Sequence, residues 1–465
     1  MPDERPDDSW TVGPTLLWFV YALIVALPLV DHSLSALADR VTAPRESAGA
    51  PPAGPAFAPQ VAAADEDVPS APIPTSAPAA SGNHDLGVLD DVCLDGSDDA
   101  CKRWAMDAFY HAVAAEKAGK LGRALRVSWY GDSVVATDAI PGRLRQRLQT
   151  ELGDGGPGFV YVEPPHRFCN NDAIVRGSSG TWLTYAISTI PIADHLYGPG
   201  GSTTETVDGA SSTIKIASGM VHGIELYYLA QPHGGTATIS ADGAELARVD
   251  TAGADKRAGW ASASDAAGAR KIEIATRGRV RLFGIDLENP TGAVVDNLGV
   301  VSVNVKSYGN NDGAHWRAEL GHRAADLIMI MIGANEAEWL APGDRDTKDY
   351  QAHYEQVLAP IREGAPNASC LVVSPTDQAE ADGTGYRSRP VMPLLVAAQR
   401  AAAHARGCAF YSTYDWMGGK SSAAKWFRAR LVSSDFQHLS RRGADKMADA
   451  VFDTLMLGYR SYAGK

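Results

Sequence analysis

Three short motifs in this sequence carry side chains able to perform nucleophilic catalysis, and the first centres on Ser133. The tripeptide Gly131-Asp132-Ser133 follows an apolar, strand-like run and precedes a helix-like segment. A serine in that position has its hydroxyl at the carboxyl edge of a sheet, and its backbone N–H at a helix start favours developing negative charge. The same tripeptide also makes a good cap between strand and helix, so the motif alone does not identify an enzyme.

The second motif pairs Asp435 with His438 just before the last helix-like segment of the chain. With two residues between them, the carboxylate can turn back to the imidazole and fix its tautomer. It can then stabilise the imidazolium that forms when a serine loses its proton. A pair of solvated loop side chains is the alternative interpretation.

The third motif places Asn335 directly after the most apolar run of the chain, in the tetrapeptide Gly333-Ala334-Asn335-Glu336. Its uncharged amide is a donor suited to an oxyanion hole, where negative charge is stabilised without proton transfer. Asparagine is also common in turns. Because all three motifs follow predicted strands, their combination favours one catalytic site at a sheet edge.

The elements that must position these motifs alternate between apolar strands and amphipathic helices. Continuous apolar strands separated by helices indicate a parallel sheet covered on both faces. Ligands of such sheets bind beyond the carboxyl ends of the strands. The predicted strands lie at 124–131, 325–333, 370–375 and 408–413, and the predicted helices at 138–153, 353–364, 390–407 and 441–460.

A different pattern occupies residues 177–289, where short alternating runs are separated by Gly, Asp and Asn. Helical periodicity is scarce there, which is typical of an antiparallel sandwich. The sequence therefore predicts an all-β domain inserted into an α/β domain made of residues 85–176 and 290–465.

The N-terminal region, residues 1–40, contains an uncharged stretch from Trp10 to Val30 that is near the length of a bilayer span. We expect a membrane anchor there, with a cleaved signal peptide ending near Ala38 as the alternative. Residues 41–84 are rich in Pro and Ala, which predicts a disordered, semi-rigid linker. This order places the catalytic domain on the periplasmic side of a bacterial envelope, tethered to the inner membrane or secreted.

Composition narrows the classes of partner. The formal net charge is −13, and an acidic surface repels phosphate backbones, so we expect no nucleic acid partner. No C-x-x-C pattern or Cys/His cluster indicates a metal site, and no cofactor is expected.

The five cysteines allow at most two disulfides. Cys93 and Cys101 flank a short acidic loop and could close it. Cys370 and Cys408 open two strand-like runs and could pair if those strands are neighbours, which leaves Cys169 over. The alternative is that all five are reduced and buried.

The order of the motifs resembles that of the SGNH/GDSL hydrolase family, whose blocks read G-D-S, a central glycine, G-x-N and D-x-x-H. The resemblance covers most of the chain outside the β insert and implies a flavodoxin-like three-layer α/β/α fold. It implies Ser133 as nucleophile, His438 as base and Asp435 as the residue that orients it. Asn335 and the backbone N–H of Ser133 are then the expected oxyanion donors.

The sequence departs from the family pattern in the second block, which here reads AVVDNLGVVSVNVKSYG. If Gly299 matches the first glycine of this block, Ser302 stands at the oxyanion-donor position. A backbone N–H donor does not depend on the side chain, but the closer approach that glycine allows would be lost.

The β insert is similar to the accessory carbohydrate-binding module of some bacterial peptidoglycan O-acetylesterases of this superfamily, and the stretch GDGGPGFVYVEPP has a counterpart there. The resemblance implies an esterase that removes O-acetyl groups from a cell-envelope polysaccharide, and O-acetylated peptidoglycan is the expected substrate. An O-acetyltransferase and an inactive sugar-binding protein are the alternatives. Candidate sugar-stacking aromatic residues in the insert are Trp182, Tyr185, Tyr197 and Trp260, which are also typical core residues.

Overall fold

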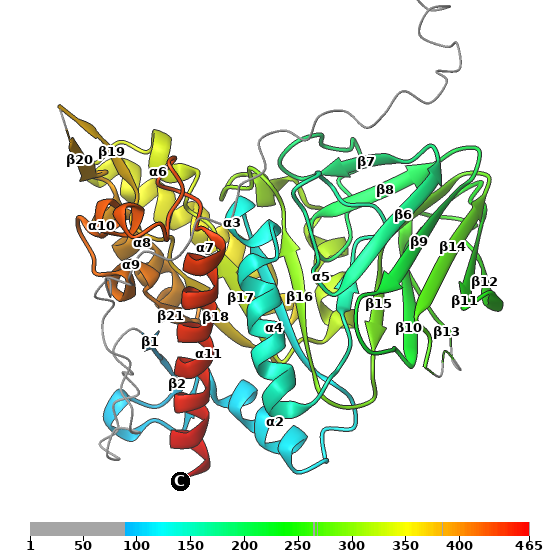
Figure 1. Ribbon diagram of the computed structural model, residues 1–465, viewed down its shortest axis with the longest axis horizontal. Helices are drawn as coiled ribbons and strands as arrows, with labels where there is room; N and C mark the ends of the chain where they lie inside the picture. Colours follow the sequence, from blue (N-terminus) through cyan, green and yellow to red (C-terminus); the bar gives the residue numbers. More distant parts are fainter. Residues whose placement is uncertain (1–88, 264–265, 267, 384, 465) are drawn as a thin grey trace, which may run out of the picture. The chain divides into compact units, whose positions relative to one another are not determined.

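The computed structural model describes residues 89–464 apart from 264, 265, 267 and 384 (Figure 1). The predicted anchor at 1–40 and the predicted linker at 41–84 lie outside these residues. Within the described part of the chain, no helix combines the length and the apolar character that crossing a bilayer requires.

A six-stranded sheet in the order β1-β21-β18-β17-β4-β16 forms the centre of the α/β domain. Neighbouring strands are parallel, except that β1 pairs antiparallel with β21. The parallel strands, counted along the chain from β4, follow the order 2-1-3-4-5 that is typical of flavodoxin-like sheets. The strands are β1 (Leu89–Asp90), β4 (Leu125–Gly131), β16 (Ala293–Gly299), β17 (Leu327–Met331), β18 (Ser369–Val373) and β21 (Ala409–Tyr411).

Helices cover both faces of this sheet, because its strands are apolar on both sides and successive side chains point to opposite faces. Trp129 belongs to the core beneath α2, α4 and α11, whereas the adjacent Tyr130 belongs to the core beneath α5, α7 and α8. The predicted three-layer arrangement is therefore confirmed. The helices are α2 (Asp107–Lys117), α4 (Ala139–Leu152), α5 (Gly313–Arg323), α7 (Asp344–Gly364), α8 (Met392–Ala405) and α11 (Arg441–Ala463).

Short elements complete this domain. A two-stranded hairpin follows β18, and two short helices precede α11. These elements are β2 (Cys93–Asp95), η1 (Asp98–Ala100), β3 (Arg103–Trp104), α3 (Ser133–Ala136), η2 (Ser307–Asn310), α6 (Glu336–Trp339), β19 (Ala379–Asp382), β20 (Gly385–Ser388), α9 (Thr413–Met417) and α10 (Ser422–Arg428).

Between β4 and β16 the chain forms two antiparallel sheets that pack on a shared core, which includes Ile214, Leu226 and Ile274. One sheet has the order β13-β10-β15-β8-β7, with β5 also paired to β15, and the other has the order β12-β11-β14-β9-β6. The sheets begin before residue 177, where the sequence interpretation began the insert. The strands are β5 (Gly158–Val160), β6 (Ile174–Gly180), β7 (Leu183–Ala186), β8 (Ser202–Thr206), β9 (Ala210–Ile216), β10 (Gly223–Ala230), β11 (Thr236–Ala241), β12 (Ala244–Asp250), β13 (Arg257–Ala263), β14 (Lys271–Arg277) and β15 (Val280–Glu288).

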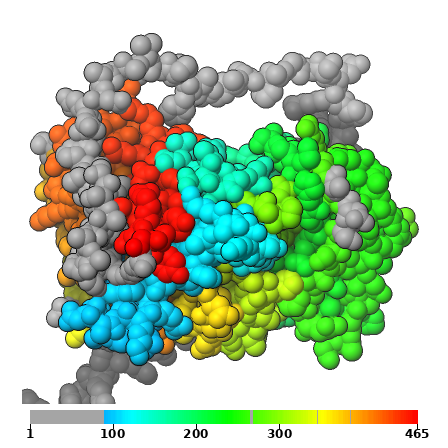
Figure 2. All heavy atoms as spheres, turned by 90° about the horizontal axis from the view of Figure 1, so that it is seen from below, coloured from blue at the N-terminus to red at the C-terminus, as the bar shows by residue number. Residues whose placement is uncertain are grey.

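A buried ion network joins this β insert to the α/β domain. Arg323, at the end of α5, pairs with Asp296 of β16 and with Asp286 and Glu288 of β15, and Arg126 of β4 also pairs with Glu288. Removing one partner from such a buried network typically costs about 3–5 kcal/mol, because it leaves an uncompensated charge. Figure 2 shows the insert, in green, on the opposite side of the molecule from α11, in red.

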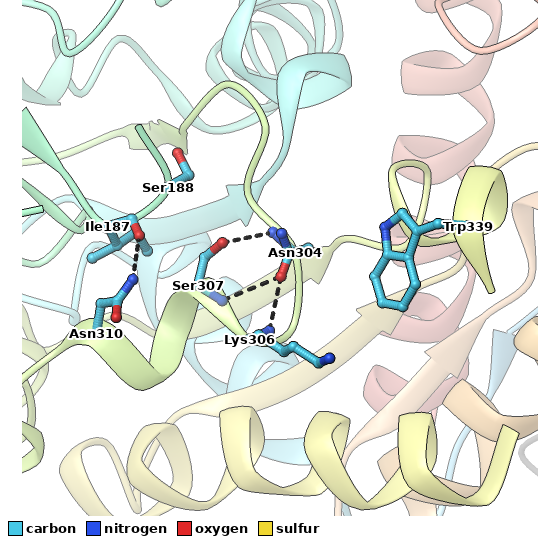
Figure 3. A pocket seen from close by; sticks show the side chains of 7 residues that line it. All are labelled: Ile187, Ser188, Asn304, Lys306, Ser307, Asn310 and Trp339. Carbon is cyan, nitrogen blue, oxygen red and sulfur yellow. Dashed lines mark hydrogen bonds between the residues drawn. The ribbon is translucent and has the colours of Figure 1, made fainter. Parts of the chain in front are cut away.

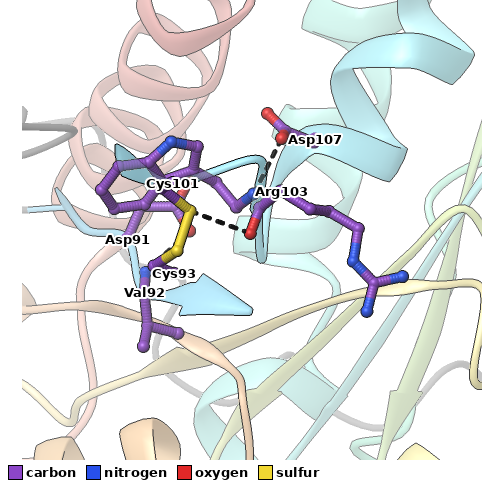
Figure 4. Close-up of a disulfide and its surroundings, with 7 residues drawn as sticks. Asp91, Val92, Cys93, Cys101, Arg103 and Asp107 are labelled. Carbon is purple, nitrogen blue, oxygen red and sulfur yellow. Dashed lines mark hydrogen bonds between the residues drawn. A yellow bond between two sulfur atoms is a disulfide. The ribbon is translucent and has the colours of Figure 1, made fainter. Parts of the chain in front are cut away.

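The structure contains two disulfides. Cys93 is joined to Cys101 across the loop between β2 and β3 (Figure 4). Cys370, in β18, is joined to Cys408 beside the neighbouring β21, with a Cα–Cα distance of 4.6 Å. The two expected pairs are therefore confirmed, and the alternative of five reduced cysteines is wrong. Cys169 is a free, buried thiol whose pKa burial raises to about 11, so it is a poor nucleophile at neutral pH.

Candidate active site

The loops that carry Ser133, Ser302 and Asn335 begin where three neighbouring strands end, whereas the Asp435–His438 motif, which was expected to follow a strand, follows α10. The N–H of Val300, just after β16, donates to the carbonyl of Gly131, the last residue of β4. The N–H of Asp132, just after β4, donates to the carbonyl of Met331, the last residue of β17. The loops that carry Ser133, Ser302 and Asn335 therefore leave the sheet at one carboxyl edge, where ligands of such sheets bind.

Ser133 is the first residue of α3, and the preceding Asp132 holds the turn that presents it. Asp132 Oδ1 accepts a hydrogen bond from the N–H of Val134 at 2.9 Å, as an N-cap residue does. Burial raises the pKa of the Asp132 carboxyl to about 6, although N–H groups of Val134 and Ala334 bind it. No described residue accepts a hydrogen bond from the N–H of Ser133 itself. That N–H is free to bind a ligand at the start of the helix.

Ser133, His438 and Asp435 form a continuous hydrogen-bonded chain. Ser133 Oγ lies 2.7 Å from His438 Nε2, and His438 Nδ1 lies 2.8 Å from Asp435 Oδ2. When the Nδ1 proton faces the carboxylate, Nε2 is left to accept the serine proton, which is the arrangement required of a general base. The sequence separates Ser133 from His438 by 305 positions, and the fold brings them into contact.

Asp435 is arranged to keep its negative charge. Partial burial favours its protonated form, but N–H groups of His438 and Gln437 and the His438 imidazole outweigh burial and lower its pKa. Oδ1 accepts the two N–H bonds at 2.9 and 3.0 Å, which leaves Oδ2 for the imidazole. The side chain is 51% exposed, so solvent weakens this ion pair relative to a buried one.

The loop that carries Asp435 and His438 is held by an aromatic cluster. Phe436 has a left-handed backbone, with φ 57°, and its side chain is buried. Its ring lies 4.5 Å from that of Tyr386 in the β19–β20 hairpin and 4.8 Å from that of Phe427 in α10. The buried phenyl ring compensates for an uncommon backbone conformation and so fixes the turn that brings His438 to Ser133.

Asn335, the predicted side-chain oxyanion donor, is tied to both neighbouring loops. Its Nδ2 donates to the carbonyl of Val303 at 2.8 Å, and its Oδ1 accepts from Gln437 Nε2 at 3.4 Å. An asparagine amide carries two N–H donors, so one is left for a ligand after the bond to Val303. The structure thus connects Asn335 with the loop after β16 and with the loop that contains His438.

Ser302 lies in the loop after β16 with a left-handed backbone, φ 64°, which is a conformation that glycine adopts most easily. Its residue is exposed, and among the described residues none accepts its N–H. The carbonyl of the preceding Val301 accepts a 2.7 Å hydrogen bond from Ser188 of the β insert. The insert therefore contacts the loop that holds the predicted donor.

A hollow of about 450 Å³ adjoins these loops, and we call it the Lys306 pocket (Figure 3). No short motif in the sequence predicts this pocket, because its walls come from separate segments of the chain. Its lining combines the insert, the segment that follows Ser302, and the last residue of α6, which begins directly after Asn335. The lining residues are Ile187, Ser188, Asn304, Lys306, Ser307, Asn310 and Trp339.

The aromatic residues proposed for sugar stacking in the insert are mostly engaged elsewhere. Tyr197 is buried, and Trp260 is stacked on His322 with ring centroids 4.0 Å apart. Trp182 packs against the sandwich core, and Tyr185 packs against the core shared with the α/β domain. In the described residues, no group of three or more His, Cys, Asp or Glu side chains is placed to hold a metal ion.

Residues 262–446 match the model of the GDSL-like Lipase/Acylhydrolase family. The match includes Ser302, Asn335, Asp435 and His438, whereas Ser133 lies before it, on the other side of the β insert. No curated protein sequence matches the chain at a significant level.

Among solved structures, the chain is similar to one described as a peptidoglycan O-acetylesterase in action, with 23% identity and a TM-score of 0.66 over 76% of this chain and 96% of that one. This likeness shows that the two chains share a fold. A family two carbohydrate esterase from Clostridium thermocellum in complex with cellohexaose shows 10% identity and a TM-score of 0.26 over 60% of this chain and 100% of that one. An acetylxylan esterase from Geobacillus stearothermophilus shows 16% identity and a TM-score of 0.26 over 35% and 73%.

Proposed function

We propose that the protein is a serine esterase that removes O-acetyl groups from a cell-envelope polysaccharide, with peptidoglycan as its substrate. The observation that carries the proposal is the hydrogen-bonded chain from Ser133 through His438 to Asp435 at the carboxyl edge of the sheet. This arrangement activates a serine hydroxyl for acyl transfer, and the segment that carries Asp435 and His438 matches the model of a GDSL-like acylhydrolase family.

In the proposed reaction, Ser133 Oγ attacks the acetyl carbonyl while His438 Nε2 takes the hydroxyl proton. The Asp435 carboxylate, whose lowered pKa keeps it ionised at neutral pH, stabilises the imidazolium. The tetrahedral intermediate collapses when His438 gives its proton to the departing sugar oxygen. Water, deprotonated by the same imidazole, then attacks the acetyl-serine and releases acetate.

Three N–H groups are the proposed oxyanion donors: the backbone N–H groups of Ser133 and Ser302, and the second amide N–H of Asn335. Two of them lack an acceptor among the described residues, and the third belongs to an amide with a spare donor. Donors held in place before the reaction stabilise charge as it develops, with no reorganisation at the moment of attack.

The assignment to an envelope glycan rests on different features. Two disulfides among the described residues favour an oxidising compartment outside the cytosol. The likeness to the peptidoglycan O-acetylesterase covers 76% of this chain, which favours an acetylated sugar as substrate. We propose that the insert contributes to glycan binding, through the Lys306 pocket and not through its core aromatic residues.

The test is an esterase assay of the purified full-length chain on a small acetyl ester and on O-acetylated peptidoglycan, followed by acetate release. A Ser133→Ala variant should lose activity on both. Asn335→Ala should lose about a hundredfold or more in kcat, the usual loss for one oxyanion donor. Wild-type turnover in Ser133→Ala would disprove the proposed nucleophile. Activity on the small ester but not on peptidoglycan would retain the chemistry and refute the substrate.

A further inference from the structure

The Lys306 pocket adjoins the loops that carry the proposed oxyanion donors Ser302 and Asn335. Asn304, Lys306 and Ser307 follow the predicted donor Ser302 within five residues, and Trp339 ends the short helix that starts after Asn335. The pocket walls are thus direct continuations of the two loops that flank the proposed oxyanion site. A ligand in the pocket lies next to those loops.

Lys306 is the cation among the pocket residues. Its Nζ lies 5.5 Å from the centroid of the Trp339 ring, and the two side chains approach one another in Figure 3. Among the described residues, no carboxylate oxygen comes within 4 Å of this ammonium group. The chain carries a formal net charge of −13, so a lysine in a hollow without a carboxylate partner is a place for an anion.

Trp339 supplies an aromatic surface to the same hollow. Its residue is 51% exposed, which is unusual for the largest apolar side chain. The C–H face of a sugar ring packs on such a ring, and the indole N–H offers a hydrogen bond. A single cation beside an aromatic face fits a sugar with one carboxylate better than a phosphate, which usually takes several basic groups or backbone N–H donors.

Polar groups on the opposite wall fix the pocket's shape and leave hydrogen-bonding capacity. Asn304 Oδ1 accepts the N–H groups of Lys306 and Ser307, and Asn310 Nδ2 donates to the carbonyl of Ile187 (Figure 3). The Asn304 amide N–H groups and the Asn310 amide oxygen have no such partner among the described residues. These groups suit sugar hydroxyls, which both donate and accept.

We propose that the Lys306 pocket binds a carboxylate-bearing sugar residue of the same glycan whose acetyl ester reaches Ser133. The proposal rests on the proposed esterase function and deepens it, because it names the chemistry of the neighbouring sugar. The carboxylate pairs with Lys306, the sugar ring packs on Trp339, and the amides of Asn304 and Asn310 bind hydroxyls. Two sources share this chemistry: the lactyl carboxylate of a muramic acid that carries no stem peptide, and the C6 carboxylate of a uronic acid.

The first test compares kcat/KM of the wild type and Lys306→Gln on an acidic and a neutral O-acetylated glycan, such as acetylated polygalacturonate and acetylated xylan. The kcat/KM of the variant should fall about tenfold more on the acidic glycan than on the neutral one, which is the effect expected from losing one charge-assisted hydrogen bond. Lys306→Arg should restore most of the difference. Lys215→Gln, which removes an exposed lysine of β9, is the matched control for net charge. Equal losses on both glycans would overturn the proposal.

The second test measures binding without turnover and stands apart from the esterase activity. Calorimetry on the Ser133→Ala chain uses trigalacturonic acid, the N-acetylglucosaminyl-N-acetylmuramic acid disaccharide, and neutral chitotriose. We expect at least one acidic probe to bind at least tenfold tighter than chitotriose, and Lys306→Gln to abolish the difference; the tighter acidic probe identifies the source. Equal binding of all three, or binding of none, refutes the pocket assignment. A wild type without esterase activity that still binds the acidic probe would refute only the proposed function.

Discussion

Replacing Ser302 by glycine separates the role of its backbone from that of its side chain. Ser302 has φ 64°, and its side chain makes no hydrogen bond to another described residue. The proposed function uses only its N–H. The Ser302→Gly variant keeps that N–H and removes the side chain, so we expect a more stable protein that retains or gains turnover.

The magnitude follows from the backbone. An L-residue in the left-handed region costs about 1–2 kcal/mol, and glycine avoids this cost. Glycine also lowers the free energy of unfolding by about 0.5–1 kcal/mol, because it gives the unfolded chain greater conformational freedom. The net expectation is a gain of about 0.5–1 kcal/mol in the free energy of unfolding. Turnover should fall by no more than about threefold, because the variant keeps the N–H donor. A threefold change corresponds to about 0.6 kcal/mol of transition-state stabilisation.

The assays are urea unfolding and kcat on a small acetyl ester, with Ala324→Gly as a matched control. Ala324 also has a left-handed backbone, with φ 47°, but it caps α5 just before β17, at the end of that strand opposite to the proposed donors. Both variants should gain similar stability, and only changes in kcat distinguish the sites. A fall of more than tenfold in the kcat of Ser302→Gly would show that the hydroxyl takes part and would refute a purely backbone role.

Three further outcomes are expected. Glu319 accepts the Trp260 indole N–H at 3.2 Å, and burial raises the pKa of its carboxyl to about 8. Because the unfolded chain loses this proton at a lower pH than the folded chain, the free energy of unfolding should fall as pH rises from about 4.5 to about 8. Glu319→Gln should therefore flatten that decline by up to about 1.4 kcal/mol per pH unit in urea unfolding, and an unchanged slope would contradict the shift. Replacing Cys370 and Cys408 by alanine opens a 38-residue loop and should lower the free energy of unfolding by about 4 kcal/mol relative to oxidised wild type, measured by thermal unfolding. Reduced wild type, which also loses the Cys93–Cys101 disulfide, should be no more stable than the variant. Asp435→Asn should lower kcat by about a hundredfold to ten-thousandfold with little change in KM, and a loss confined to KM would refute its role in orienting the base.

The α/β domain could be predicted in most of its detail because its signals are local. The apolar run at 325–333 became β17, and the helix-like segment at 441–460 became the core of α11, since burial on both faces or one face dictates those patterns. The insert was predicted less completely. Strands such as β8, with the sequence STTET, and β13, with RAGWASA, are polar or small, and they are strands because their neighbours β15 and β10 pair with them.

The candidate site divides in the same way. Ser133 and Asn335 were predicted because they follow parallel strands, whose ends must meet at one edge. Asp435 and His438 were predicted from their spacing, since in the structure they follow α10 and not a strand. The contact of Ser188 with the Val301 carbonyl spans 113 positions and joins two domains, so no local pattern contains it.

The sequence by itself determined the chemistry this protein can offer: a serine after a strand, then an aspartate and a histidine near the C-terminus, in an order that suits acyl transfer. Only the tertiary structure decided the 2.7 Å contact of Ser133 with His438, the left-handed turn at Ser302, and the hollow that joins Lys306 to Trp339. The physical reason is that side-chain type and periodicity act over a few residues. A pocket, in contrast, depends on which distant surfaces the packed core forces together.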